Sequence, residues 1–147
     1  MRNPQFPDLG RPCRGLLRWV DLAATNIASA KVFYAGMFGW RSSDEAMNGG
    51  QFTRFNVSGM DFGSAYQLSH AHRAQGVPSH WTPYFEVGDL EEALARAISL
   101  GGEVVVHLAN APGLARIALI LDPVGALVGL WELPGAGFTE SSDAGAG

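Results

Sequence analysis

Two helix signals in the same register, one in each half of the chain, constrain the fold more than any other feature of the sequence. The first helix is predicted to begin after Thr25 or Asn26, either of which can cap it, and to end at Gly39. The second is predicted to begin at Asp89, which forms a D-x-x-E capping box with Glu92, and to end at Gly101 and Gly102. The expected apolar faces are Ile27, Ala30, Phe33, Tyr34 and Met37 in the first helix, and Leu90, Ala93, Leu94, Ala97 and Ile98 in the second. The sequence therefore predicts an internal repeat.

Apolar or alternating segments flank both helices and predict strands. One such segment precedes each helix and three follow it, with turn residues between them. The expected strands are residues 14–22, 40–43, 51–58 and 61–69 in the first half, and 81–87, 103–108, 114–121 and 126–133 in the second. This order predicts an α+β fold of two β-α-β-β-β modules, and an ordinary α+β sandwich is the alternative.

The expected domain organisation follows from these elements. One domain covers residues 14–133, with modules at 14–69 and 80–133 and a polar connector at 70–79. Residues 1–13 form an N-terminal extension, and residues 134–147, rich in Gly, Ala and Ser, form a tail that is expected to be flexible. A chain of 147 residues is long enough to bury a single core.

Composition excludes several classes of partner. The formal net charge is -4, and the ten Lys and Arg residues form no basic stripe, so nucleic acid is not expected as a partner. No segment resembles a signal peptide or is apolar enough to span a membrane, which predicts a cytoplasmic protein with no membrane partner. The only cysteine, Cys13, excludes an internal disulfide and a cysteine-based zinc site, and an exposed thiol is expected there.

Several segments carry a family resemblance. Residues 19–40 (WVDLAATNIASAKVFYAGMFGW) resemble the opening of glyoxalase, bleomycin-resistance and dioxygenase proteins, the vicinal oxygen chelate superfamily. The second half resembles the same superfamily at residues 84–89, at 101–102, and from Arg116 through 122–125 to Trp131. The similarity is greatest to a glyoxalase-like subgroup that begins with a Trp-x-Asp-Leu strand and is often labelled hydroxylase. It implies a curved mixed sheet with a cup-shaped cavity for a small molecule, in a protein that is often a homodimer.

The resemblance also implies where a metal would be held. In metal-dependent relatives, His, Glu or Gln side chains on the strands bind a divalent cation. The matching positions in this chain are Trp19, Tyr66, Thr82 and Gly129, none of which supplies such a ligand. We therefore expect no metal and no other cofactor, and a divalent metal remains the alternative.

Strand alternation predicts which side chains line the cup. Four positions match the metal ligands of the relatives, and residues on the same strand faces as these positions should point into the cup. The predicted ligand-binding residues are Trp19, Tyr66, Thr82, Tyr84, Leu127, Gly129 and Trp131, with Leu17, Ser64 and Leu68 on the same faces. Arg116 could bind an anionic group or pair with a carboxylate. The aromatic residues could equally be core residues of a filled cup.

Two carboxylates, Asp21 and Glu86, are the candidate catalytic residues. A carboxylate on an inward face among aromatic rings should have a raised pKa and could act as a general base. The alternatives are a structural ion pair with Arg18, Arg54 or Arg116, or a position at a strand end where the carboxylate reaches solvent.

Four histidines are the remaining candidates for chemistry. His70, His72 and His80 lie at the predicted connector, where they could bind zinc or nickel or simply be solvated loop residues. His107 is either a proton shuttle or a strand-end residue.

Three functions follow from these observations. The first is metal-independent binding of a small aromatic or partly apolar molecule, as in sequestration or resistance. The second is a cofactor-independent isomerase, cyclase or lyase that uses Asp21 or Glu86 as base with Tyr66 or Tyr84 as hydrogen-bond donor. The third is a divalent-metal-dependent enzyme of the glyoxalase or dioxygenase type. The sequence does not identify the ligand.

Overall fold

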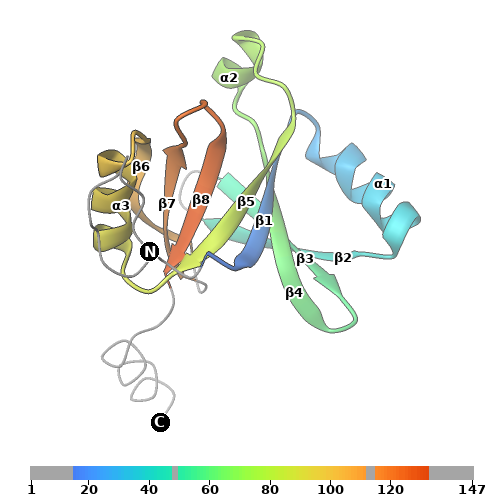
Figure 1. Cartoon of the computed structure of the whole chain (residues 1–147). Coiled ribbons are helices and arrows are strands. Elements are labelled where there is room, and N and C mark those ends of the chain that lie inside the picture. The colour runs from blue at the N-terminus through green and yellow to red at the C-terminus, as the bar shows by residue number, and fades with distance from the viewer. Residues whose placement is uncertain (1–14, 48–49, 112–114, 133–147) are drawn as a thin grey trace. The chain divides into compact units, whose positions relative to one another are not determined.

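A computed structural model describes residues 15–47, 50–111 and 115–132 (Figure 1). The chain divides into two compact units. The N-terminal unit contains residues 18–84, and the C-terminal unit contains residues 85–132 together with 15–17.

The N-terminal unit contains the first predicted module and the start of the next strand. Its elements are β1 (Leu17–Ala24), α1 (Ile27–Phe38), β2 (Arg41–Met47), β3 (Gly50–Val57), β4 (Met60–Gln67), α2 (His70–Ala74) and the first part of β5 (His80–Val87). The strand order is β2-β3-β4-β1-β5. Strand β1 pairs in parallel with β4, while β2, β3 and β4 form an antiparallel meander, so the pairing is that of a mixed sheet.

The C-terminal unit repeats this order of elements. After the end of β5 come α3 (Leu90–Ser99), β6 (Glu103–Ala111), β7 (Ala115–Leu121) and β8 (Leu127–Glu132). The strand order is β5-β8-β7-β6, and β6, β7 and β8 pair antiparallel. The described residues therefore contain two β-α-β-β-β modules, and the predicted fold class is confirmed.

Both predicted helix starts are confirmed. The Asn26 side chain accepts a hydrogen bond from the backbone N–H of Ser29 at 3.0 Å, and the Asp89 side chain accepts one from the N–H of Glu92 at 2.9 Å. Helix α1 ends where predicted, because Gly39 adopts φ 74°, a left-handed conformation that favours glycine.

The predicted apolar stripe of α1 is wrong at two positions. Phe33 and Met37 are 59% and 62% exposed, whereas Ile27, Ala30 and Tyr34 pack against the buried cluster of Leu22, Ala24, Phe55 and Ala65. Apolar residues occur almost all round this helix, so periodicity could not identify the side that packs on the sheet.

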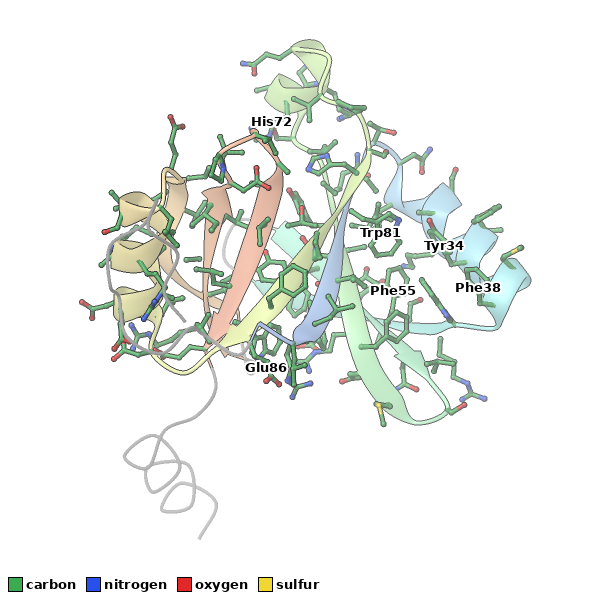
Figure 2. All side chains as sticks on the ribbon, viewed as in Figure 1. Tyr34, Phe38, Phe55, His72, Trp81 and Glu86 are labelled. Carbon is green, nitrogen blue, oxygen red and sulfur yellow. The ribbon has the colours of Figure 1, made fainter. Side chains whose placement is uncertain are left out.

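An aromatic cluster forms the core between α1 and the sheet of the N-terminal unit. The rings of Tyr34 and Trp40 stack with centroids 4.9 Å apart, and Trp40 meets Phe62 edge to face at 4.5 Å. The indole N–H of Trp81 donates to the hydroxyl of Tyr34 at 3.2 Å. Figure 2 shows Tyr34, Phe55 and Trp81 gathered beside α1. These contacts establish which face of each strand looks toward the helix.

A smaller aliphatic core holds the C-terminal unit together. Leu90, Ala93 and Leu94 of α3 are buried. They pack against Val87, Ala118 and Leu130 of β5, β7 and β8. The even-numbered residues of β7 and β8 therefore face α3.

The connector between the modules contains a short helix that the sequence did not predict. Helix α2 begins after Ser69, whose hydroxyl accepts a hydrogen bond from the backbone N–H of His72 at 3.0 Å. Five residues are too few for an apolar period to be visible. His70 and His72 thus lie on a helix, and their interpretation as loop residues is wrong (Figure 2). None of the described helices is long and apolar enough to span a membrane.

Candidate functional site

One face of the N-terminal unit brings together most of the residues predicted for that half of the site. Leu22 and Ala24 of β1 contact the core under α1, so alternation sends Trp19 and Asp21 to the opposite face. The β1–β4 register pairs Asp21 with Ser64 and Ala23 with Tyr66. Trp81 of β5 packs toward α1. By alternation His80, Thr82 and Tyr84 of the same strand point away from that helix. We call this surface the site face, and it contains Trp19, Asp21, Ser64, Tyr66, His80, Thr82 and Tyr84.

A hydrogen-bond chain joins three side chains of the site face. The indole Nε1–H of Trp19 donates to Ser64 Oγ at 2.8 Å, and Ser64 Oγ in turn donates to Asp21 Oδ1 at 2.7 Å. Trp19 and Ser64 are only 5% and 6% exposed. Since a hydroxyl has one proton, the indole bond orients the Ser64 proton toward the carboxylate. The chain therefore holds Asp21 in one orientation as an acceptor.

A close approach of two strands makes this chain possible. Gly63 lies next to Ser64 on β4, and a Cβ atom there would lie 2.7 Å from the carbonyl oxygen of Val20 on β1. Any other residue would push the two strands apart. Gly63 thus allows the contact between Ser64 and Asp21.

The environment of the site face changes the acidity of its groups. Burial raises the pKa of Asp21 above its ordinary value, and the hydrogen bond from Ser64 and the charge of His80 offset part of that effect. Burial and then the negative charge of Asp21 raise the pKa of Tyr66. The same two causes, with Tyr66 as a third, raise the pKa of Tyr84. Both phenols therefore stay neutral at neutral pH, and the carboxyl group exchanges its proton closer to neutrality than an exposed aspartate does.

Exposure differs among the rings of the site face. Tyr84 is 6% exposed, whereas Tyr66 is 39% exposed. Thr82 is buried as well. A molecule that reaches Asp21 from solvent would therefore meet Tyr66 first.

Arg54 is bound to other carboxylates than Asp21. The guanidinium of Arg54, one of the predicted partners, pairs with Glu45 and with Asp61, the latter at 3.4 Å. Among the described residues, the hydrogen bond to Asp21 comes from Ser64 and ends on Oδ1. Sequence reasoning placed Ser64 on the correct face but gave it no role, and it did not connect His80 with Asp21. The sequence signal for Ser64 is the side-chain alternation along β4, which places it on the same face as Tyr66.

The other predicted ligand-binding residues lie in the C-terminal unit. The β7–β8 register pairs Gly129 with Leu119 and Trp131 with Ile117. Leu130 contacts α3, so Leu127, Gly129 and Trp131 point to the opposite face of their own unit. Their predicted role in binding stays a prediction.

Arg116 is held by a carboxylate, in line with one of its two sequence interpretations. Its Nη1 lies 3.2 Å from Oε1 of Glu132, whose Oε2 accepts a hydrogen bond from the backbone N–H of Leu90 at 2.9 Å. By strand alternation Arg116 lies on the α3 side of β7, whereas Gly129 and Trp131 lie on the other side. This placement favours a structural ion pair over a ligand contact.

The second candidate carboxylate, Glu86, belongs to the C-terminal unit. Its backbone is bonded to the two residues just before β1, because its N–H donates to Leu16 O at 2.8 Å and its carbonyl accepts from Gly15 N at 3.1 Å. Figure 2 shows Glu86 near the end of β5. Its predicted catalytic role stays a prediction.

The residues of the site face do not fit a divalent cation. The predicted ligand positions in this unit hold Trp19, Tyr66 and Thr82. Asp21 is the carboxylate beside them, because Glu45 on the same side of the sheet is bound to Arg54. Across the described ranges, no group of three or more His, Cys, Asp or Glu side chains could hold a metal ion. The histidines of the connector have other contacts: His72 Nδ1 lies 3.0 Å from Ser69 Oγ, and His80 Nδ1 lies 2.9 Å from Pro78 O.

Solved structures of known proteins share this fold. The hypothetical protein BH1468 of Bacillus halodurans matches with a TM-score of 0.66 at 17% identity, over 82% of this chain and 95% of that chain. Methylmalonyl-CoA epimerase from Mycobacterium tuberculosis matches with a TM-score of 0.61 at 19% identity, over 91% of this chain and 99% of that chain. At these identities the likeness concerns the fold alone.

Curated relatives are more similar in sequence. CFP32 of Mycobacterium tuberculosis, which bears the provisional name of a glyoxylase, is 30% identical over 121 residues, or 81% of this chain and 46% of that protein. The anthracycline biosynthesis protein DnrV of Streptomyces peucetius is 31% identical over 129 residues, or 80% of this chain and 47% of that protein. The chain thus spans about half the length of these relatives. Because the family model matches residues 16–130, the chain belongs to the Glyoxalase/Bleomycin resistance protein/Dioxygenase superfamily.

Proposed function

We propose that this protein binds a small, aromatic or partly apolar organic molecule against the site face without a metal ion. The observation that carries the proposal is the Trp19–Ser64–Asp21 hydrogen-bond chain, which fixes one half-buried carboxylate near aromatic rings. Pockets for organic molecules combine apolar walls with a few oriented polar groups. Trp19, Tyr66 and Tyr84 supply such walls, and Asp21 supplies the polar anchor.

Two further observations support this proposal. The donor set of the site face is a poor match for Mg²⁺, Zn²⁺ or Fe²⁺, which take several carboxylate or imidazole ligands. In addition, a Streptomyces relative is named an anthracycline biosynthesis protein, and anthracyclines are polycyclic aromatic molecules. A ligand of that chemical kind could stack on the rings of the site face.

A second candidate function is acid–base catalysis without a cofactor. Its supporting observation is that burial raises the pKa of Asp21, which suits a group that takes and returns a proton near neutral pH. Asp21 would act as the base, and Tyr66 or Tyr84 as hydrogen-bond donor to the substrate. Replacement of Asp21 by Asn should then remove turnover and leave substrate affinity within a few-fold.

Intrinsic tryptophan fluorescence tests the binding proposal. The purified protein is titrated with a panel of aromatic metabolites and antibiotics, once with EDTA and once with added Mg²⁺, Zn²⁺ or Fe²⁺. We expect at least one saturable ligand with the same affinity in both conditions. Binding that occurs only when a divalent cation is present would contradict the proposal and support the metal-dependent alternative.

Two expectations about the whole protein accompany this proposal. We expect a homodimer, which light scattering coupled to size-exclusion chromatography measures directly. We also expect a cytoplasmic location, which cell fractionation tests.

A further inference from the structure

We infer that the ligand of the site face is an organic cation, an aromatic or partly apolar molecule that carries a protonated amine. Asp21 is its counter-charge, and the rings of Trp19, Tyr66 and Tyr84 surround the ammonium group. This inference rests on the proposed binding function and specifies the chemical class of the ligand.

The first argument is the charge of the site face. Asp21 is half-buried, and none of the ion pairs found among the described residues includes it. The groups close enough to interact with its charge are the phenols of Tyr66 and Tyr84, which are neutral, and the imidazole of His80. Arg54, whose backbone pairs with Ser64, is bound to Glu45 and Asp61. A carboxylate that is partly removed from water gains from a bound cation.

The second argument concerns the two oxygens of the carboxylate. Ser64 donates its proton to Oδ1, and no described residue donates to Oδ2. The Ser64 hydroxyl has one proton, which it donates to Oδ1 while its oxygen accepts the bond from the Trp19 indole. An ammonium group is a strong donor with no acceptor, so it complements Oδ2.

The third argument is the kind of ring around Asp21. Indole and phenol faces carry negative potential and attract cations, and an indole does so most strongly. Trp19 lies on the same strand face as Asp21, and both tyrosines are close enough to sense its charge. Aromatic faces beside one carboxylate form a typical site for an organic ammonium ion.

Other ligand classes fit less well. An anionic molecule would be repelled by the charge of Asp21, which water screens less at a half-buried position than in bulk solvent. A neutral donor such as an alcohol would bind Oδ2 without the added charge attraction that a cation gains. The observations thus favour a cation.

Three probes of equal size test the inference by calorimetry at neutral pH: 2-phenylethylamine, which is protonated, neutral 2-phenylethanol and anionic phenylacetate. We expect the amine to bind about tenfold tighter than the alcohol, the gain of one charged hydrogen bond, and the anion to bind weakest. In Asp21→Asn the affinities for amine and alcohol should differ by less than about threefold. Asp61→Asn, a matched change of an exposed carboxylate, should keep the wild-type preference.

The outcomes separate this inference from the proposed function. If all three probes bind with equal affinity, the protein binds apolar molecules but the cation preference is refuted. If none binds at millimolar concentration, both proposals fail for this ligand size. The wild-type comparison needs no variant, so it remains decisive even if Asp21→Asn fails to fold by circular dichroism.

Discussion

The hydroxyl of Ser64 on β4 lies 2.7 Å from the carboxylate of Asp21 on the parallel neighbour β1. The two residues are far apart in sequence but directly paired in the β1–β4 register. Their contact places a half-buried carboxylate with a raised pKa on the sheet face that carries Trp19 and Tyr66. Buried carboxylates reduce the stability of a fold unless they are compensated, so this residue pair is a strong candidate for function.

Ser64→Ala should lower the free energy of unfolding by about 1–3 kcal/mol. The substitution leaves the buried indole N–H of Trp19 without its acceptor and removes the donor to Asp21. Urea denaturation followed by circular dichroism measures the loss. Ser42→Ala, at an exposed position of β2, is the matched control and should change the stability by less than about 0.5 kcal/mol. Equal effects in both variants would show that the hydrogen-bond chain does not stabilise the fold.

Asp21→Asn should raise the stability at neutral pH by about 1–2 kcal/mol, as replacements of costly functional groups often do. Because folding raises the pKa of Asp21, its proton stabilises the folded state below the ordinary value of 3.8, and this contribution is lost as the pH rises through the folded-state pKa. The advantage of the Asn variant should therefore shrink as the pH falls. Denaturation curves of both proteins from about pH 4 to about pH 8 measure the difference. A difference that does not change with pH would contradict the raised pKa.

Trp19→Phe should remove most of the fluorescence change that a bound ligand causes and weaken binding by about tenfold, since it loses ring area and the bond to Ser64. Trp81→Phe is the matched control, because Trp81 packs in the aromatic core beside Tyr34. The Trp81→Phe variant should keep both the fluorescence change and the ligand affinity. Loss of both in Trp81→Phe, with no loss in Trp19→Phe, would place the ligand on the α1 side of the sheet.

Phe55→Ala should cost about 3–5 kcal/mol of stability, whereas Phe33→Ala should cost less than about 1 kcal/mol. Phe55 is 1% exposed at the centre of the aromatic cluster, and Phe33 is 59% exposed on α1. Thermal and urea denaturation of the two variants tests which side of α1 packs on the sheet. Comparable losses of stability in the two variants would support the apolar face predicted from the sequence, in which Phe33 packs on the sheet.

Glu132→Ala should destabilise the protein by about 1–2 kcal/mol, because Glu132 binds both the backbone N–H of Leu90 and the guanidinium of Arg116. Glu103→Ala, an exposed change in β6, should have little effect. If Arg116 is structural, Arg116→Met should leave ligand affinity unchanged. A loss of affinity for anionic ligands in Arg116→Met would instead support the ligand role.

Much of the fold could be predicted because its signals are local. Asn26 and Asp89 cap their helices through side chains three residues from the bonded N–H groups, and Gly39 ends α1 with its own backbone conformation. Helix α2 was missed because Ser69 caps a helix too short to show a period.

The part of the site that could be predicted is the set of residues that share one face of a single strand. Alternation along single strands placed Trp19 with Asp21 and Thr82 with Tyr84 on common faces. The structure brings Ser64 to the first pair, because the β1–β4 register pairs Asp21 with Ser64 and the indole of Trp19 donates to the Ser64 hydroxyl. The same rule could not show whether Arg116 would meet a ligand or a carboxylate. Its pairing with Glu132 depends on how β7 and β8 align.

The sequence by itself determined the order of the strands and of the two longer helices, the N-caps of those helices, and which residues share a face of β1 and of β5, because these depend on neighbouring residues and on fixed backbone periods. Only the tertiary structure decided which side of α1 packs on the sheet, which partner each charged group finds, and that Ser64 orients Asp21. These features depend on contacts between distant segments, such as the close approach of β1 and β4 at Gly63, and no local pattern encodes them.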